Sequence, residues 1–263
     1  MKGTVYLVGA GPGAPDLLTL RAARLLEAAD IVFHDALVHP ETLALAAKAE
    51  KIAVGKRCGK HSTVQKFINK RLVDAAQKHK IVIRLKGGDP MLFGRAQEEI
   101  DALSAADIAF EVVPGITAAL AASAQIGVSL TRRGLSRNVA FLTPRVGDTE
   151  HAGDWAASAI GADTAAIYMG AGQAEMISVT LIARGMSADT PVAILENLSL
   201  PDASVRYDTL GALPRIAAAS GAGPALILLG EVLREQLGAQ LALAGKLHRA
   251  RACAGSTLAP SSR

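Results

Sequence analysis

A regular alternation of strand-like and helix-like segments over residues 1–115 is the feature that most limits the fold of this 263-residue chain. Short apolar runs rich in β-branched residues predict strands at 4–8, 30–34, 51–54, 81–85 and 110–113. Amphipathic segments predict helices at 17–29, 62–78 and 95–106, with Ser62 capping the second, and Glu98, Glu99 and Asp101 on a polar face of the third. This alternation predicts an α/β fold with a mostly parallel, doubly wound sheet.

The second half of the chain has a different pattern. An alanine-rich helix is predicted after Pro114 and Gly115, and further strands at 139–143, 165–169, 192–196, 205–209 and 225–229. The last three strands come with little helix between them, which predicts hairpins and a mixed sheet. We therefore expect two α/β domains, 1–115 and 116–238, with the ligand cleft between them, and a flexible basic tail at 239–263.

The composition gives no indication of a protein-bound metal, and a small anionic partner fits the basic charge as well as a nucleic acid does. Cys58 and Cys253 are far apart, and the six histidines show no metal-ligand spacing. The net charge is +4, but aromatic residues are only 3%, which leaves few platforms for stacking bases. Scattered arginines can instead pair with the carboxylates of a small polyanion.

The location expected from the sequence is the cytoplasm. The most apolar stretch, 116–130, contains Thr117, Ser123 and Gln125, so it predicts a buried helix and no membrane span. The N-terminus runs directly into a predicted strand and lacks the regions of a signal peptide.

A first glycine-rich loop, VGAGPG at 8–13, directly follows the first predicted strand. It departs from the dinucleotide fingerprint because Pro12 occupies an interior position and Ala14 stands where the third glycine would fall. Proline has no N–H, so the loop is a poorer cradle for a pyrophosphate. A nucleoside cofactor without phosphates is therefore favoured over a dinucleotide or a purely structural turn.

Two more small-residue motifs follow predicted strands. RLKGGDPMLFGR at 84–95 lies at the carboxyl end of the fourth strand, where open α/β sheets bind ligands. Its Asp89 could accept from a ligand amine or hydroxyl, or could cap the turn, and the residues alone leave both open. VPGITA at 113–118 could offer backbone N–H groups and the Thr117 hydroxyl to a ligand, but more often forms a cap.

Asp35 and Lys56 follow the second and third predicted strands. Asp35 comes about twenty residues after the first glycine loop, where a dinucleotide fold has its ribose ligand. Together, an aspartate and a lysine at neighbouring strand ends could accept and donate a proton. Spacing alone favours a surface ion pair.

Taken together, the motifs resemble a known enzyme family. VYLVGAGPGAPD at 5–16, HDALV at 34–38, VGKR at 54–57, RLKGGDPMLFGR, FEVVPGITA at 110–118 and YMG at 168–170 occur in the order and spacing of the uroporphyrinogen-III C-methyltransferases. The resemblance covers about residues 3–232. It implies two α/β domains with S-adenosylmethionine (SAM) bound between them, usually in a homodimer. It also implies methylation of uroporphyrinogen III at C2 and C7 to precorrin-2, which leads to sirohaem and cobalamin.

The resemblance also implies roles for individual residues. Asp35 would be the proton acceptor and Lys56 the proton donor, which replaces the ribose interpretation of Asp35. Relatives often have glycine at the position of Leu198. Eight substrate carboxylates call for cationic partners, for which Arg57, Arg84, Arg95, Arg132 and Arg133 are candidates. The SAM pocket would comprise Pro12, Gly87, Gly88, Asp89, Leu92, Thr117, Ala118, Met169, Leu198 and Ala225.

Some positions depart from the family pattern. TRRG at 131–134 and TPR at 143–145 stand where many relatives read THRD or THRG and TGH, and Ala14 replaces a common aspartate. These departures bear on the substrate more than on the SAM pocket. The altered TRRG segment leaves open a methyltransferase of the same family that acts on a later corrin precursor. Two further alternatives are a SAM-binding homologue without catalysis and an NAD-binding oxidoreductase.

Overall fold

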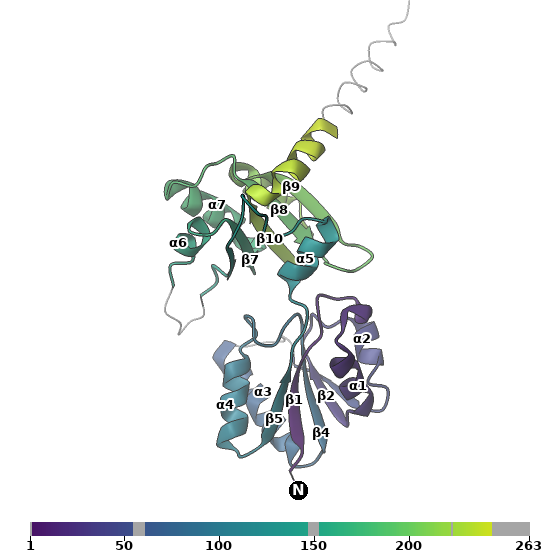
Figure 1. Cartoon of the computed structure of the whole chain (residues 1–263). Coiled ribbons are helices and arrows are strands. Elements are labelled where there is room, and N and C mark those ends of the chain that lie inside the picture. Colours follow the sequence, from purple (N-terminus) through teal and green to yellow (C-terminus); the bar gives the residue numbers. More distant parts are fainter. Residues whose placement is uncertain (1, 55–60, 147–152, 222, 244–263) are drawn as a thin grey trace, which may run out of the picture. The chain divides into compact units, whose positions relative to one another are not determined.

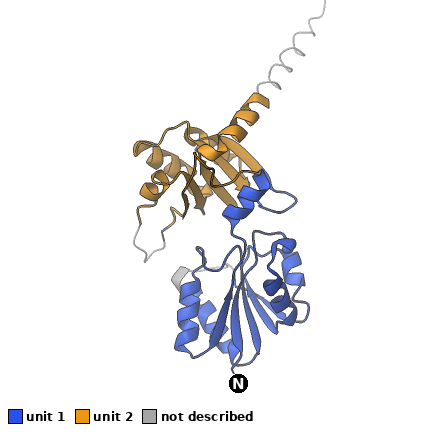
Figure 2. Cartoon of the chain, in the orientation of Figure 1, with its two compact units in different colours: residues 1–126, 146–151, 197–204 blue, residues 127–145, 152–196, 205–263 orange. Residues whose placement is uncertain are grey.

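The computed structural model describes residues 2–54, 61–146, 153–221 and 223–243. The chain forms two compact units (Figure 2). Unit 1 comprises Met1–Ile126, Val146–His151 and Asn197–Ser204, and unit 2 comprises Gly127–Arg145, Ala152–Glu196 and Val205–Arg263. The division thus falls after Ile126, beyond the expected boundary at residue 115, and a later segment, Asn197–Ser204, joins unit 1.

The described part of unit 1 contains a parallel five-stranded sheet in the order β3-β2-β4-β1-β5. Each strand lies within one residue of its predicted bounds. The strands β1, β2 and β4 are mostly buried and rich in β-branched residues, which gives a clear signal. The strands are β1 Thr4–Gly9, β2 Ile31–His34, β3 Glu50–Ala53, β4 Ile81–Lys86 and β5 Ala109–Val113.

Helices cover both faces of this sheet (Figure 1). On one face α1 (Leu20–Ala28) and α2 (Pro40–Ala44) pack over a core that includes Val8, Val32 and Leu85. On the other face α3 (His61–Ala76) and α4 (Ala96–Ala105) pack over a core that includes Leu7, Phe33 and Leu72. The doubly wound α/β arrangement is therefore confirmed.

Local signals explain where the helices begin. The Thr19 hydroxyl accepts a hydrogen bond from the Ala22 N–H and caps α1. Helix α3 begins at His61, one residue before the Ser62 that was expected to cap it. The predicted alanine-rich helix is present as α5 (Ala118–Ile126).

The connections of unit 1 identify where a ligand would bind. From β1 the chain passes to α1 on one face, whereas from the neighbouring β4 it passes to α4 on the other face. Ligands of open α/β sheets bind beyond the carboxyl ends of two such strands. In this chain, that point is occupied by the segments that follow β1 and β4, which are the first two glycine motifs.

Unit 2 contains the predicted mixed sheet, in the order β6-β7-β10-β8-β9. Its β6 and β7 are parallel, whereas β10 is antiparallel to both β7 and β8. The expected hairpin of β9 and β10 does not form, because α8 (Leu213–Ala218) separates them and β10 lies between β7 and β8. The strands are β6 Val139–Leu142, β7 Thr164–Tyr168, β8 Pro191–Glu196, β9 Ser204–Thr209 and β10 Ala225–Gly230.

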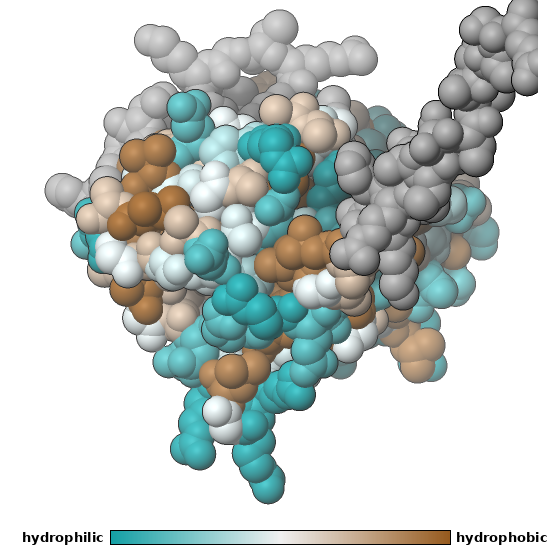
Figure 3. All heavy atoms as spheres, turned by 90° about the horizontal axis from the view of Figure 1, so that it is seen from above, coloured by the Kyte–Doolittle hydropathy of each residue, from teal (hydrophilic) through white to brown (hydrophobic). Residues whose placement is uncertain are grey.

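Three helices of unit 2, none of them predicted, build its core. Helices α6 (Trp155–Ile160), α7 (Ala174–Ala183) and α8 contribute buried side chains such as Ile177 and Leu213 to one apolar cluster. On the molecular face seen in Figure 3, apolar side chains form separate small groups among hydrophilic ones. Among the described residues, no helix combines the length and apolar character that a membrane crossing requires.

Candidate active site

The three glycine motifs meet beyond the carboxyl ends of β1, β4 and β5. The Gly11 N–H donates to the Gly88 carbonyl at 3.2 Å, and the Gly88 N–H donates back to the Gly11 carbonyl at 2.7 Å. A Cβ on Gly115 would lie 2.3 Å from the Gly88 oxygen and 2.8 Å from the Gly9 Cα. The motifs are therefore in backbone contact with one another, and Gly115 leaves room for that contact.

Asp89 ties the second motif to the third. Its Oδ1 accepts a hydrogen bond from the Met91 N–H at 2.8 Å, and its Oδ2 accepts one from the Gly115 N–H at 3.0 Å. Of the two interpretations left open by the sequence, the turn cap is thus observed. An ionised carboxylate has about four lone-pair positions, so these two bonds leave capacity for a ligand.

The segment Asn197–Ser204 lies against the first glycine loop. The Ala14 N–H donates to the Ser199 hydroxyl at 2.9 Å, and a Cβ on Gly13 would lie 3.0 Å from the Leu198 carbonyl oxygen. The Ser199 N–H in turn donates to the Gln125 side chain near the end of α5 at 2.9 Å. Leu198 is 6% exposed, so little of it is open to a ligand.

Eight of the predicted SAM-pocket residues thus belong to unit 1, in loops and at a helix start beyond the strand ends. Thr117 is nearly buried and directly precedes α5, whose first residue is Ala118. Leu92 belongs to the turn in which its N–H donates to the Asp89 carbonyl at 3.4 Å. The others in this group are Pro12, Gly87, Gly88, Asp89 and Leu198.

The remaining two predicted pocket residues belong to unit 2. Met169 follows β7 with a positive φ of 55° and is 44% exposed. Ala225 begins β10, and its neighbour Leu226 pairs with Tyr168, the last residue of β7. Within unit 2, Met169 and Ala225 therefore lie at the same edge of the sheet.

Asp35 lies directly after β2, beside β4. Its N–H donates to the Leu85 carbonyl at 3.2 Å, and its Oδ1 accepts from the Arg84 Nη2 at 2.5 Å. The Asp35 side chain is 30% exposed, whereas the Arg84 side chain is 4% exposed. The observed ion pair of Asp35 is thus with a buried arginine, and Lys56, the lysine paired with it in the sequence argument, lies outside the described residues.

The prediction that Arg84 binds substrate carboxylates is wrong, because its guanidinium is buried and already bonded to Asp35 and Glu99. Burial alone would lower the pKa of Arg84, but the two carboxylates raise it above its ordinary value overall. Arg95 pairs with Glu98 and Arg132 with Glu235, both at the surface. Arg133 is exposed, and Arg57 lies outside the described residues.

Sequence reasoning also missed the role of Glu99. The expected polar face of α4 is wrong at this position, since Glu99 is completely buried and bonded to Arg84 and Lys86. Burial, followed by the nearby Arg84 charge, lowers the pKa of Lys86. Arg84 and Lys86 alternate along a central strand, and two cations on one buried face of a strand require a carboxylate partner. The spacing of Arg84 and Lys86 along the strand could therefore have indicated a buried carboxylate partner.

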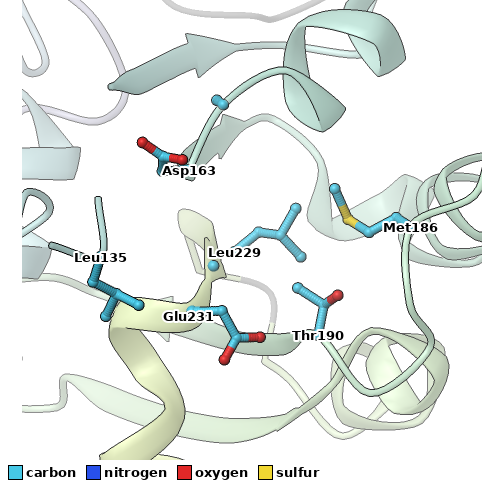
Figure 4. Close-up of a pocket in the computed structure, with 8 residues that line it drawn as sticks. Leu135, Asp163, Met186, Thr190, Leu229 and Glu231 are labelled. Carbon is cyan, nitrogen blue, oxygen red and sulfur yellow. The ribbon is translucent and has the colours of Figure 1, made fainter. Parts of the chain in front are cut away.

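A separate pocket of about 240 Å³ lies in unit 2 (Figure 4). It contacts Gly230, which pairs with Thr164 at the opposite end of β7 from Met169. Its Asp163 carboxylate accepts from two backbone N–H groups, and its Glu231 carboxylate pairs with Arg234. None of the predicted site residues lines this pocket, so it is not the candidate site. Among the described residues, no cluster of acidic, histidine or cysteine side chains suits a metal ion.

Comparison with known proteins identifies the family. The family described as "Tetrapyrrole (Corrin/Porphyrin) Methylases" matches residues 4–214. The siroheme synthase of Sodalis glossinidius is 48% identical over 232 residues, which cover 88% of this chain and 49% of that protein. The chain thus spans about half the length of the curated relatives that it matches.

Two solved structures are similar to this chain in both fold and sequence. A uroporphyrin-III C-methyltransferase from Thermus thermophilus, complexed with S-adenosylhomocysteine, is 38% identical with a TM-score of 0.76 and covers 88% of this chain and 99% of that one. A cobalt precorrin-4 methyltransferase of cobalamin biosynthesis is 28% identical with a TM-score of 0.77 and covers 88% and 95%. Since the family match spans most of both units, the chain belongs to the tetrapyrrole (corrin/porphyrin) methylases.

Proposed function

We propose that the protein uses SAM to methylate uroporphyrinogen III at C2 and C7 and so gives precorrin-2, the precursor of sirohaem and cobalamin. The observation that carries the proposal is the convergence of Gly11, Gly88 and Gly115 beyond the strand ends of unit 1, with Asp35 after the adjacent β2. The 38% identity to a uroporphyrin-III C-methyltransferase, across nearly its whole length, supports the substrate.

The unit 1 loops fit a nucleoside cofactor. Pro12 lacks an N–H, and the N–H of Gly11 is bonded to Gly88, so the loop has few donors left for a pyrophosphate. Thr117 and Ala118 of the third motif stand at the start of α5. Bound SAM would supply an electrophilic methyl group on its sulfonium. The ten residues named above, including Met169 and Ala225 of unit 2, would bind and orient it.

Asp35 and Lys56 would act as the proton acceptor and the proton donor of the reaction. When a pyrrole carbon forms a bond to the methyl group, the ring gains positive charge and must lose a proton elsewhere. Asp35 would accept such a proton, and its orientation is fixed by Arg84. Lys56 would donate a proton. The exact alignment of the carbon nucleophile with the methyl group supplies much of the rate.

The polycarboxylate substrate requires cations, for which Arg57, Arg95, Arg132 and Arg133 remain candidates. The net charge of +4 agrees with an anionic substrate. We further propose that the enzyme acts in the cytoplasm as a homodimer, as the family resemblance implies. Sedimentation at several protein concentrations would test the dimer.

The test of the function is an anaerobic assay with SAM and enzymatically made uroporphyrinogen III, read by mass spectrometry. The wild type should add two methyl groups, whereas Asp35→Asn and Lys56→Ala should be slower by about a hundredfold. Asp107→Asn is the matched control, since Asp107 is an exposed aspartate before β5, at the opposite end of the unit 1 sheet from the glycine motifs. Wild-type protein that transfers no methyl group would refute the proposal.

A later corrin precursor is a second candidate substrate. TRRG at 131–134 departs from the pattern of uroporphyrinogen enzymes, and a cobalt precorrin-4 methyltransferase has the same fold at 28% identity. If uroporphyrinogen III is inert while S-adenosylhomocysteine still binds, later corrin precursors should be assayed. Methylation of one of them would transfer the proposal to that substrate.

A further inference from the structure

A cluster of buried charges lies within unit 1, between β4 and α4. Arg84 and Lys86 are the fourth and sixth residues of β4 and are 3% and 2% exposed. Glu99 of α4 is 0% exposed. Charged side chains are almost never fully buried unless they are paired, so the pairing of these three needs an explanation.

Glu99 bonds to both cations with different oxygens. Its Oε1 accepts from the Arg84 Nε at 3.0 Å, and its Oε2 accepts from the Lys86 Nζ at 3.0 Å. The Gln65 side chain of α3 adds a further hydrogen bond to Oε1 at 3.2 Å. The carboxylate plane is therefore fixed from three directions.

Arg84 links Glu99 to Asp35 through hydrogen bonds. While its Nε bonds to Glu99, its Nη2 donates to the Asp35 Oδ1 at 2.5 Å and its Nη1 donates to the Leu85 carbonyl at 3.2 Å. A guanidinium is planar, so fixing one edge fixes the direction of the other. Asp35 is the only member of the cluster with an appreciably exposed side chain.

The cluster needs the negative charge of Glu99 to be neutral. Two cations, Arg84 and Lys86, face two carboxylates, Glu99 and Asp35, so the cluster is neutral. Without the Glu99 charge, the buried cations would repel each other with only Asp35 to compensate. Arg84 would then lose the ionic bond at its Nε and keep only its bonds to Asp35 and the Leu85 carbonyl, so it would hold the Asp35 carboxylate less firmly.

We propose that Glu99 is a positioning residue for methyl transfer: it fixes Arg84, and Arg84 holds the Asp35 carboxylate in the orientation that accepts the substrate proton. This inference rests on the proposed function, because Asp35 is the proton acceptor only if the chain methylates a tetrapyrrole.

The experiment compares Glu99→Gln with Leu103→Ala in the anaerobic uroporphyrinogen assay, using the full chain. The glutamine keeps the size of the side chain and removes its charge. Leu103 lies on the same helix, is 0% exposed and packs in the apolar core, so Leu103→Ala controls for lost stability. We expect kcat to fall by about tenfold or more in Glu99→Gln only, with the KM and the affinity for S-adenosylhomocysteine changed by less than about threefold in both.

A double-mutant cycle with Asp35→Asn separates positioning from general damage. If Glu99 acts through Asp35, Glu99→Gln should change kcat by less than about twofold in the Asp35→Asn background. Additive losses would overturn the proposal, as would a normal kcat in the Glu99→Gln single variant. Arg84→Lys keeps the buried charge but cannot bridge two carboxylates, so it should show the same loss of kcat if Glu99→Gln does not fold.

Wild-type turnover separates the two proposals. An inactive wild type overturns the proposed function and with it the role of Asp35. An active wild type with an unaffected Glu99→Gln variant overturns only the positioning role.

Discussion

At the scale of single residues, the site depends on backbones that approach one another more closely than side chains permit. A Cβ on Gly9 would lie 2.6 Å from the Gly115 Cα, and a Cβ on Gly115 would lie 2.3 Å from the Gly88 oxygen. Gly88 itself has a φ of 67°, in the left-handed region that glycine adopts without strain. The same residues form the loops that we propose to hold SAM, so close packing and ligand binding depend on the same atoms.

Gly115→Ala should weaken the binding of S-adenosylhomocysteine by about tenfold or more, equivalent to about 1.4 kcal/mol. The added Cβ would lie 2.3 Å from the Gly88 oxygen, so the second and third motifs must separate. Titration calorimetry would measure the affinity. Gly153→Ala is the control, because no heavy atom lies within 4 Å of its added Cβ. Equal affinities for the two variants would contradict the prediction.

Asp89→Ala should lower the free energy of unfolding by about 1–3 kcal/mol, because the Gly115 and Met91 N–H groups lose their acceptors. Asp89→Asn should cost less, since its one amide oxygen still accepts a hydrogen bond. Urea unfolding would give both values. Equal losses in the two variants would mean that the charge of Asp89, which both remove, matters more than its hydrogen bonds.

At the scale of elements, an aspartate before a strand aligns its parallel neighbour in each unit. The Asp30 carboxylate precedes β2 and accepts from the Lys80 and Ile81 N–H groups at the start of β4. In unit 2, Asp163 precedes β7 and accepts from the Arg137 and Asn138 N–H groups just before β6. Both fix the register of parallel strands at the ends where they begin.

Asp30→Ala should lower the free energy of unfolding at pH 7 by about 0.5–1.5 kcal/mol, a modest effect because the group is near the surface. The Ile81 N–H, and then the Lys80 N–H, lower the pKa of Asp30 below its ordinary 3.8, although burial opposes them. A carboxyl with a lowered pKa in the folded state stabilises the fold above its ordinary pKa and loses that effect as the pH falls through the folded value.

The difference between wild type and Asp30→Ala should therefore be constant above about pH 5 and shrink below pH 3.8. Urea unfolding at a series of pH values would measure it. Asp74→Ala is the control, since Asp74 forms only an exposed ion pair with Lys70 and should cost less than about 0.5 kcal/mol. A difference that grows as the pH falls would refute the assigned cause.

Element length decides how much of this fold was predictable. The ten strands found among the described residues were all predicted within about one residue. Most of them are distinct apolar runs between turn residues, whereas β3 (EKIA) and β9 (SVRYDT) are not. Helices α2, α6 and α8 were missed, since five or six residues are too few to show a helical period. Helix α7 was missed for another reason: Met176, Val179 and Ile182 are apolar but exposed, so it has no polar face.

The site was predictable as a set of motifs but not as a set of contacts. The glycine loops follow the strands after which a doubly wound sheet binds ligands, so their convergence follows from topology. The link from Glu99 through Arg84 to Asp35 joins three elements, and helical periodicity placed Glu99 on the solvent side. Only tertiary packing shows which charged residues of a helix are buried.

At the scale of the whole molecule, each unit has its own hydrophobic core. Unit 1 is built on two clusters, one on each face of its sheet, and unit 2 on a cluster between its sheet and α6, α7 and α8. The predicted pocket residues come from both units, although most belong to unit 1. Thermal unfolding of the free protein therefore need not be a single transition, and unit 1 should respond most to ligand.

S-adenosylhomocysteine should raise the melting temperature, and NAD should not. At about 100 times its Kd, a ligand that binds only the folded state adds about 2.7 kcal/mol to the free energy of unfolding. For a protein of this size, that corresponds to a shift of about 5–10 °C. Differential scanning fluorimetry at matched ligand concentrations would measure both shifts. Pro12 and Ala14 weaken the first loop as a pyrophosphate cradle, so stabilisation by NAD alone would favour the oxidoreductase alternative and contradict the assignment of the glycine motifs to SAM.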